Sequence, residues 1–443
     1  MAIVLLYVVK ELMQNISNLY FFYVWLSSCI LILSILGTSV VDSKKHKGVC
    51  RSAGKGKFKK TKKVMGYYPV YNFKIQSPNN SYTDVLFFVA EPQTNLTFSF
   101  GQNLTIPHAE KLAVEFVDLA KKHNVNPLLS IGGWTGSRHF SELSSTAERR
   151  TSFATTMVKY AKKLGFVGID LDWEYPNGEG IGCNTHSPQD TVNFGLLLKL
   201  HELTTERQAM MWKSESCGPQ AQLTAALGLN GLIGSNGSPA DATETAGIAE
   251  NLDFVNLMAY DVFGAWAPTT GPLAPLYATC APAGFGQSVE TGVEIMVKQG
   301  FKVQQIILGL PAYAKRLELV SPELTPDDGQ WNENPGGIAD DKPGLDVCGN
   351  EQKWGGSFLT TELISNGWLS KDQKTGMNGY KRHFDKCSGT PFLTNRKYFI
   401  TYEDHFTSVS KAKWAQEKHL AGVFFFDTTG PTKSTVSAAA RAL

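Results

Sequence analysis

The sequence has few charged residues, and it contains neither an internal repeat nor a low-complexity tract. Asp, Glu, Lys and Arg together make up 19% of the 443 residues, whereas hydrophobic residues make up 42%. This balance, with 41 Gly and 20 Pro, excludes a disordered, collagenous or coiled-coil chain. We therefore expect a globular protein rich in turns, long enough for two domains or for one large barrel.

Acidic residues are absent from residues 44–63, a stretch that carries ten Lys or Arg. Residues 64–443 have the opposite balance, with 31 basic and 38 acidic side chains and a net charge of −7. This charge favours a neutral or polar partner and argues against nucleic acid. We interpret residues 42–63 as a solvated basic linker or propeptide.

The N-terminal residues 1–41 are interpreted as a signal peptide or a signal anchor. No charge interrupts the run from Tyr20 to Val41, which is long enough for a secretory leader or for a membrane span. Small residues at 37–39 fit a cleavage site, while the Lys cluster that follows is unfavourable to translocate. We expect a secreted, extracellular protein without stable membrane association, and a signal-anchored form is the alternative.

Cysteines are few, and their number suits an oxidising compartment. Outside the leader an even set remains, sufficient for three disulfides: Cys50, Cys183, Cys217, Cys280, Cys348 and Cys387. Proximity in the sequence suggests the pairs Cys348–Cys387 and Cys183–Cys217, and buried free thiols in a cytosolic enzyme are the alternative. Four sequons outside the leader also suit a secreted glycoprotein, at Asn79, Asn95, Asn103 and Asn236.

Strand and helix patterns alternate beyond residue 63. Eight short β-rich runs appear, at Val64–Tyr68, Val85–Ala90, Pro127–Ile131, Val167–Asp172, Leu223–Ala226, Phe254–Ala259, Gln305–Leu308 and Gly422–Phe426. Amphipathic helical stretches lie between them, such as Ala109 to His123 and Ser145 to Leu164. A capping box of Ser145 with Glu148 begins the second helix, and Gly165 ends it. The pattern predicts an α/β fold, a (β/α)8 TIM barrel whose function lies where the strands end.

One segment interrupts this alternation. Residues 317–393 are rich in Gly, Pro, Asp, Asn and Trp, and they lack a clear 3.6-residue period. A connection of this length is not expected to be structureless in a compact protein. We therefore predict a small α+β insertion domain between strands seven and eight, with the barrel formed by residues 64–316 and 394–443.

Three acidic residues occupy alternate positions along the fourth predicted strand: Asp170, Asp172 and Glu174. Because side chains alternate between the two faces of a strand, these three point the same way. In a barrel they would line the lumen near the C-terminal end of the strand. Carboxylates roughly 6–7 Å apart cannot all ionise easily, so at least one should hold a proton near neutrality. Such a carboxyl is what a general acid requires, and a solvated strand end or a calcium-binding patch is the alternative.

This segment resembles the fourth-strand signature of glycoside hydrolase family 18, the chitinases and their relatives, which is D-x-x-D-x-D-x-E followed by Tyr-Pro. Four other segments extend the resemblance in the right order: Met65–Pro69, Ser130–Trp134, Met258–Asp261 with Trp266, and Gly309–Tyr313. Each pattern is weak alone, but the five together are specific. The resemblance covers essentially everything after residue 63, and the chain is most similar to fungal members that carry a chitinase insertion domain.

The resemblance implies a retaining, substrate-assisted hydrolysis of β-1,4-linked N-acetylglucosamine polymers, without a metal or organic cofactor. Glu174 would be the general acid/base, Asp172 would hold the acetamido group that attacks the anomeric carbon, and Asp170 would share a proton with Asp172. Tyr67 and Ser130 would support Asp170. The resemblance assigns further substrate contacts to Trp134, Tyr175, Met258, Tyr260, Asp261, Trp266 and Phe426. Chitin or a chitooligosaccharide is the implied partner, and a monomer is expected.

Two positions depart from the family pattern. Val167 stands where the family usually has Asp, and Phe426 stands where it usually has Trp. On a regular strand Val167 faces the helices, where Val packs well, but a bulge at Gly168 would turn it inward. Phe426 can still provide an apolar floor for a sugar. We favour an active chitinase over two alternatives, a catalytically impaired chitin-oligosaccharide-binding protein and an endo-acting enzyme on N-glycan cores.

Overall fold

The computed structural model describes residues 62–70, 78–101, 104–203, 222–319, 344–351 and 356–443. The expected leader, the expected linker up to residue 61, Cys50, Cys217 and the sequon at Asn103 lie outside these residues. Within the described residues, no helix combines the length and the apolar character that a membrane span needs.

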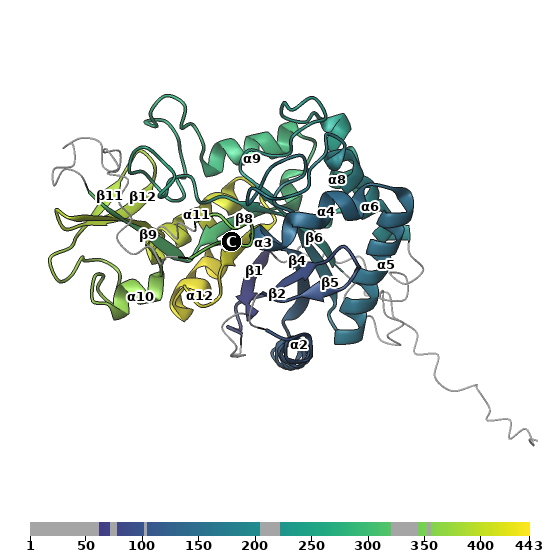
Figure 1. Ribbon diagram of the computed structural model, residues 1–443. Helices are drawn as coiled ribbons and strands as arrows, with labels where there is room; N and C mark the ends of the chain where they lie inside the picture. The colour runs from purple at the N-terminus through teal and green to yellow at the C-terminus, as the bar shows by residue number, and fades with distance from the viewer. Residues whose placement is uncertain (1–61, 71–77, 102–103, 204–221, 320–343, 352–355) are drawn as a thin grey trace, which may run out of the picture. The chain divides into compact units, whose positions relative to one another are not determined.

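Eight parallel strands form a closed barrel (Figure 1). They are β1 (Lys63–Pro69), β2 (Asp84–Pro92), β4 (Asn126–Gly132), β5 (Gly168–Asp172), β6 (Gln222–Gly228), β7 (Phe254–Met258), β8 (Ile306–Pro311) and β14 (Gly422–Phe426). Each strand pairs with the next in this order, and β14 pairs with β1, which closes the barrel. A short β3 (Phe98–Ser99) pairs antiparallel with β2. All eight barrel strands overlap the eight predicted runs, so the predicted (β/α)8 barrel is confirmed.

Helices occupy the connections between the barrel strands. They are α2 (Ile106–Lys122), α3 (Gly133–Gly136), α4 (Phe140–Ser144), α5 (Ala147–Leu164), α6 (Asp190–Leu203), α8 (Ala242–Asn251), α9 (Val289–Lys298), α11 (His405–Glu417) and α12 (Lys433–Ala442), with 3-10 turns at η2 (Ser137–His139) and η3 (Val303–Gln305). Both helical stretches named from the sequence are present, as α2 and α5.

The predicted start of α5 is wrong by one residue. Thr146 is the N-cap, and its side chain accepts a hydrogen bond from the Arg149 N–H at 3.3 Å. The third helical position is therefore Arg149 and not Glu148, so the expected capping box does not form. Gly165 ends the helix with φ of 85°, as expected.

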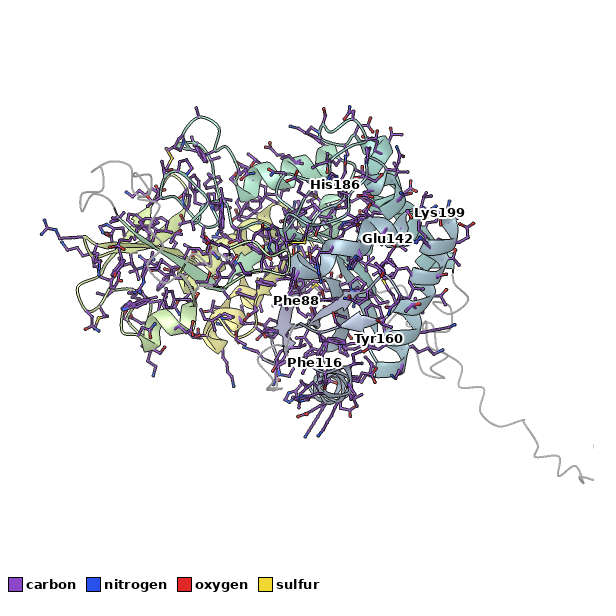
Figure 2. All side chains as sticks on the ribbon, in the orientation of Figure 1. Phe88, Phe116, Glu142, Tyr160, His186 and Lys199 are labelled. Atoms are coloured by element: carbon purple, nitrogen blue, oxygen red, sulfur yellow. A yellow bond between two sulfur atoms is a disulfide. The ribbon has the colours of Figure 1, made fainter. Side chains whose placement is uncertain are left out.

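Hydrophobic residues form one layer outside the barrel and another inside it. In the outer layer, Phe116 of α2 packs on Phe87 of β2 with ring centroids 5.3 Å apart, and Tyr160 of α5 stacks on Phe98. Figure 2 labels Phe116 and Tyr160 on their helices. The inner layer fills the lumen with fully buried side chains from five strands, namely Met65, Leu86, Leu128, Ile307 and Phe424. The lumen is therefore a packed core beneath the ends of the strands.

β5 has the alternation of faces that the sequence predicts. The outer hydrophobic layer contains Ile169, Leu171 and Trp173. Asp170 and Asp172 have the opposite parity and are buried. The register of β5 with β4 and with β6 continues without a shift, so no bulge at Gly168 turns Val167 inward. Val167 precedes the strand and is only partly buried, which means that it packs less tightly than a core valine.

The segment between β8 and β14 forms a second, antiparallel sheet of five strands, drawn in green to yellow-green in Figure 1. Its elements are β9 (Tyr313–Glu318), β10 (Ser357–Leu359), α10 (Thr360–Ser365), β11 (Lys381–Asp385), β12 (Thr390–Thr394) and β13 (Tyr398–Tyr402). The sheet has a hydrophobic core of its own that includes Ala314, Leu363, Leu393 and Ile400. It is the insertion expected between strands seven and eight. Its strands extend beyond residues 317–393, because β9 follows β8 after the single residue Ala312.

Two disulfides connect the barrel with the inserted segment, and both differ from the expected pairs. Cys183 is bonded to Cys348 with their Cα atoms 5.6 Å apart, and Cys280 is bonded to Cys387 with their Cα atoms 5.9 Å apart. The predicted pairs Cys348–Cys387 and Cys183–Cys217 are therefore wrong. They rested on proximity in the sequence, whereas the observed bonds span 165 and 107 residues.

Candidate active site

Asp170 lies at the centre of a buried hydrogen-bond network inside the barrel. Its Oδ2 accepts hydrogen bonds from the hydroxyls of Tyr67 at 3.0 Å and Ser130 at 2.9 Å, the two supports that the resemblance implied. Its Oδ1 accepts from Thr224 Oγ1 at 2.6 Å and from Asn256 Nδ2 at 3.1 Å. Burial raises the pKa of the Asp170 carboxyl, and these four hydrogen bonds oppose the rise. Donors from four different strands thus fix this carboxyl in one orientation.

Thr224 and Asn256 are the members of this network that the sequence analysis missed. Both are fully buried, and both stand on strands, β6 and β7, whose other buried residues are apolar. Asn256 also donates to the Tyr67 hydroxyl at 3.0 Å. The alternation of faces that identified the acids of β5 also holds for β6 and β7. The same rule would have identified Thr224 and Asn256.

Asp172 lies two residues farther along the same face, and one of its oxygens lacks a partner. The residue is 3% exposed, and its Oδ1 has no hydrogen-bond partner among the described residues. Burial raises the pKa of Asp172 well above its usual value, and the negative charges of Glu174 and Asp170 add to the rise. A buried polar atom without a partner costs free energy, which a ligand can recover by supplying the missing hydrogen bond. Asp172 can therefore accept a hydrogen bond from a polar group of a ligand.

Glu174 follows β5 and is nearly buried, with 9% of its surface exposed. Its backbone is held on both sides, because its N–H donates to the Ser137 hydroxyl at 2.8 Å and its carbonyl accepts from Asn184 Nδ2 at 2.7 Å. Burial raises the pKa of Glu174 to about 7, while a hydrogen bond from Tyr175 opposes the rise and the charge of Asp261 adds to it. The proton therefore stays on Glu174 to a higher pH than on an ordinary carboxyl. This is the protonation behaviour that a general acid needs.

A glycine lets β4 approach the acidic end of β5. Gly132 has φ of 116°, and an added Cβ would lie 2.1 Å from the carbonyl oxygen of Asp172. A residue with a side chain does not fit at this position. The close approach places the Ser130–Trp134 motif against β5, with Ser130 below the carboxyls and Trp134 at the surface.

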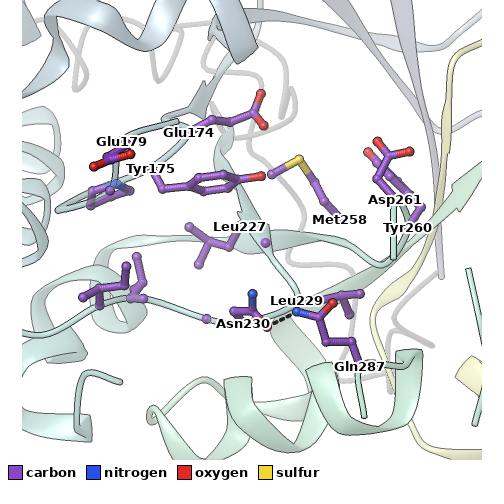
Figure 3. A pocket seen from close by; sticks show the side chains of 16 residues that line it. Glu174, Tyr175, Glu179, Leu227, Leu229, Asn230, Met258, Tyr260, Asp261 and Gln287 are labelled. Carbon is purple, nitrogen blue, oxygen red and sulfur yellow. Dashed lines mark hydrogen bonds between the residues drawn. The ribbon is translucent and has the colours of Figure 1, made fainter. Parts of the chain in front are cut away.

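Two cavities meet at Glu174. The larger has a volume of about 890 Å³, and its lining includes Tyr67, Phe88, Trp134, Asp172 and Phe426. The smaller has a volume of about 380 Å³ and extends to the loops after β5 and β6 (Figure 3). Four residues line both cavities, namely Glu174, Met258, Tyr260 and Asp261. In Figure 3 the Tyr175 ring lies beside Glu174, with its hydroxyl directed toward Met258.

Phe426 forms an apolar floor next to the carboxyls. Its ring centroid lies 5.6 Å from that of Tyr67, 5.3 Å from that of Phe88 and 6.0 Å from that of Tyr260. Burial is the main effect that raises the pKa of Tyr260 well above its usual value. The negative charge of Asp172 is the next largest effect and raises it further. The Tyr260 hydroxyl therefore stays protonated and is a hydrogen-bond donor at the floor of the site.

The remaining expected site residues take different positions. Tyr175 lines the smaller cavity, and Trp134 lines the larger one with 48% of its surface exposed. Asp170 and Ser130 are buried below the cavities and line neither. Trp266 is 58% exposed and lines neither, with Lys315 Nζ 5.8 Å from its ring centroid. The described residues contain no cluster of three or more His, Cys, Asp or Glu that could hold a metal ion.

Comparison with known proteins places this site in a family. The sequence profile described as "Glycosyl hydrolases family 18" matches residues 63–430. The chain belongs to this family. A chitinase-like effector of Moniliophthora roreri is 34% identical to this glycosyl hydrolase over 358 residues, covering 76% of this chain and 83% of that protein. Chitinase A1 of Niallia circulans is 30% identical over 322 residues, covering 71% of this chain and 42% of that protein.

Solved structures share the fold of this glycosyl hydrolase. The chitinase RmChi1 of Rhizomucor miehei aligns with a TM-score of 0.73 at 23% identity, covering 86% of this chain and 99% of that chain. A class V chitinase of Nicotiana tobaccum, in complex with NAG4, aligns with a TM-score of 0.67 at 21% identity, covering 86% of this chain and 98% of that chain. At these identities the likeness shows the fold alone, so the role of each residue has to be argued from the geometry of the site.

Proposed function

We propose that this glycosyl hydrolase is a secreted chitinase that cleaves β-1,4-linked N-acetylglucosamine polymers. The observation that carries the proposal is the pair Asp172 and Glu174, an acid with an unpartnered buried oxygen next to an acid whose pKa is about 7. Substrate-assisted hydrolysis of an N-acetylated sugar needs one group to hold the acetamido group and another to donate a proton. The chitinases among the relatives, and neighbours in complex with NAG4 and with (GlcNAc)3, support the choice of substrate.

In this mechanism the acetamido oxygen of the substrate attacks the anomeric carbon while the glycosidic bond breaks. Glu174 gives its proton to the glycosidic oxygen, so the departing sugar leaves as an alcohol. Asp172 accepts the acetamido N–H at its unpartnered oxygen and stabilises the positive charge of the oxazolinium intermediate. Tyr260 donates its hydroxyl to the acetamido carbonyl and so orients it for attack. A water molecule then opens the intermediate while Glu174 acts as the base, which gives retention of configuration.

Asp170 is a positioning residue in this scheme. Four hydrogen bonds fix its carboxyl below the cleft, and its negative charge helps to raise the pKa of Asp172. The two acids share one proton in the free enzyme. When the cationic intermediate forms, its positive charge favours the ionised form of Asp172.

The shape of the cleft suits a chain of sugars. Because the two cavities meet at Glu174, a polymer can extend to both sides of the bond that is cleaved. Phe426 and Trp134 offer aromatic surface on which the apolar face of a pyranose can pack.

Incubation of the purified protein with chitohexaose tests the proposal. We expect the wild type to produce shorter oligomers, detected by mass spectrometry, and Glu174→Gln to lose about 10²–10⁴-fold in rate while still binding the ligand. The amide keeps the shape of the side chain but delivers no proton. A wild type that binds chitohexaose without shortening it would indicate a binding protein, and Glu174→Gln activity within threefold of the wild type would remove the role of Glu174.

Secretion and glycosylation belong to the same proposal. Both disulfides between described cysteines suit an oxidising compartment. The sequon residues Asn95 and Asn236 are exposed, whereas Asn79 is half-buried and its Nδ2 donates to the Lys433 carbonyl at 3.0 Å. We expect the mature protein to lack the leader and to carry glycans at Asn95 and Asn236. Mass spectrometry of the mature N-terminus and of peptides before and after enzymatic deglycosylation tests both statements.

A further inference from the structure

A short hairpin of the inserted segment, residues 345–351, forms part of the wall of the larger cavity. Leu345 and Glu351 pair as an antiparallel bridge at its base. The carboxylate of Asp346 accepts hydrogen bonds from the N–H groups of Cys348 at 2.8 Å and Asn350 at 2.9 Å. The Asp346 N–H donates to the Asn350 carbonyl at 2.8 Å. These bonds fix the shape of the hairpin itself.

A disulfide attaches this hairpin to the loop that follows Glu174. Cys348 of the hairpin is bonded to Cys183 of the loop. The loop is in turn held against Glu174, because Asn184 donates to the Glu174 carbonyl at 2.7 Å. Gly180 approaches the same carbonyl so closely that an added Cβ would lie 2.1 Å from the oxygen. The disulfide and the Asn184 hydrogen bond therefore connect the hairpin to the backbone of the proposed general acid.

Leu345 is the most exposed apolar residue that the hairpin presents at the cleft. Its side chain is 65% exposed, and it lines the larger cavity next to Asp346 and Val347. The same cavity contains the exposed ring of Trp134. A single exposed leucine is ordinary on a protein surface, but on the wall of a sugar cleft it offers apolar surface to a pyranose ring.

The hairpin contributes to only one of the two cavities that meet at Glu174. A sugar at Glu174 is enclosed by residues of the barrel, namely Asp172, Met258, Tyr260 and Phe426. The hairpin residues line the larger cavity but not the smaller one. A contact with Leu345 therefore belongs to sugar units on one side of the cleaved bond.

We propose that Leu345 is a substrate-binding residue for sugar units beyond the one that is cleaved, and that the Cys183–Cys348 disulfide holds it in place for binding. The proposal rests on the proposed function, because it requires a linear oligosaccharide in the cleft. A wall that is already in position binds a ligand more tightly than one that must be ordered during binding. The disulfide thus contributes to the affinity for long oligosaccharides and not to the chemistry at Glu174.

Binding can be measured separately from turnover in the Glu174→Gln background. Isothermal titration calorimetry gives the Kd for chitobiose and for chitohexaose. We expect Leu345→Ala to weaken chitohexaose binding about fivefold and to leave chitobiose binding within about twofold. Leu196→Ala is the matched control, because Leu196 is also an exposed leucine, on α6, and lines neither cavity. The control should change neither Kd.

The double variant Cys183→Ser, Cys348→Ser should likewise weaken chitohexaose binding and leave chitobiose binding within about twofold. Its matched control is Cys280→Ser, Cys387→Ser, which removes the other disulfide between the barrel and the inserted segment. This control should leave both Kd values within about twofold. Leu345→Ala retains both disulfides, so it tests the proposal even where the cysteine variants do not fold.

Unchanged chitohexaose binding by Leu345→Ala would overturn the role of the hairpin, and so would an equal loss for the two ligands. The failure of the proposed function has a different signature. In that case the Glu174→Gln protein would bind no chitohexaose, or would still cleave it, before any change is made to the hairpin.

Discussion

The Thr224 hydroxyl donates to Asp170 Oδ1 at 2.6 Å, the shortest of the four hydrogen bonds that hold this carboxyl. Asp170 is fully buried, so the bond is not weakened by competition with water. Burial raises the pKa of Asp170, and the bond from Thr224 is the largest of the effects that oppose the rise. The protonation of Asp170, and with it the charge felt by Asp172, therefore depends on a residue that belongs to no sequence motif.

Thr224→Val tests this dependence, because valine keeps the shape of threonine and removes the donor. We expect a loss of stability of about 1–3 kcal/mol and a decrease of about tenfold in kcat. The pKa of the Asp170 and Asp172 pair should rise, which moves the acidic limb of the pH–rate profile to higher pH. Thr224→Ser should restore the profile. A lower Tm with an unchanged pH–rate profile would show that Thr224 is structural only.

The barrel and its three acids could be predicted because they depend on local pattern. The eight strands are short apolar runs separated by helical sequence, and the shared face of Asp170 and Asp172 follows from alternation along one strand. The features that were missed depend on which segments meet in space. Cys183 pairs with Cys348 across 165 residues, and no spacing in the sequence indicates that contact.

Replacing Glu174 should also change the pH dependence of folding stability. Its pKa is raised from an ordinary value of 4.5 to about 7 in the folded protein, so the folded state binds the proton more tightly than the unfolded state. The stability that this group contributes is complete below about pH 4.5 and is lost as the pH rises through 7. Glutamine does not titrate, so Glu174→Gln should gain stability relative to the wild type between pH 5 and pH 8.

The expected gain is about 3 kcal/mol, from about 1.4 kcal/mol per pKa unit. Thermal unfolding of both proteins at pH 5 and pH 8 measures it as a difference in Tm that widens with pH. A difference in Tm that stays constant between the two values would mean that Glu174 keeps an ordinary pKa in the folded protein.

The rate of hydrolysis should follow a bell-shaped dependence on pH, with its maximum on the acidic side of neutrality. The fall at higher pH reports loss of the proton from Glu174, whose pKa is about 7. The fall at lower pH reports protonation of the coupled carboxyls, so the two apparent pKa values belong to the set and not to single residues. Initial rates of chitohexaose cleavage from pH 3 to pH 9 measure the profile, and a flat rate from pH 4 to pH 8 would contradict the coupling.

Val167→Asp places the acid of the family pattern at the one position of the signature where this chain lacks it. The backbone of Val167 is bonded to both neighbouring strands, donating to the Pro127 carbonyl at 2.9 Å and accepting from the Gln222 N–H at 3.2 Å. With no register shift in β5, the side chain has the parity of the outer face. It cannot join the Asp170 network without a change in the strand.

The sequence alone predicts a cost of several kcal/mol for this substitution, since Val167 was expected to be packed among apolar groups. Because Val167 is partly exposed, we expect the loss of folding stability to be only about 1 kcal/mol. The rate of chitohexaose cleavage should stay within threefold of the wild type. Leu171→Asp is the matched control, because Leu171 has the same parity and is 1% exposed. A charge at that position should cost several kcal/mol. A tenfold gain in cleavage by Val167→Asp would instead show that position 167 reaches the carboxyls, and that this chain has lost activity by losing an acid there.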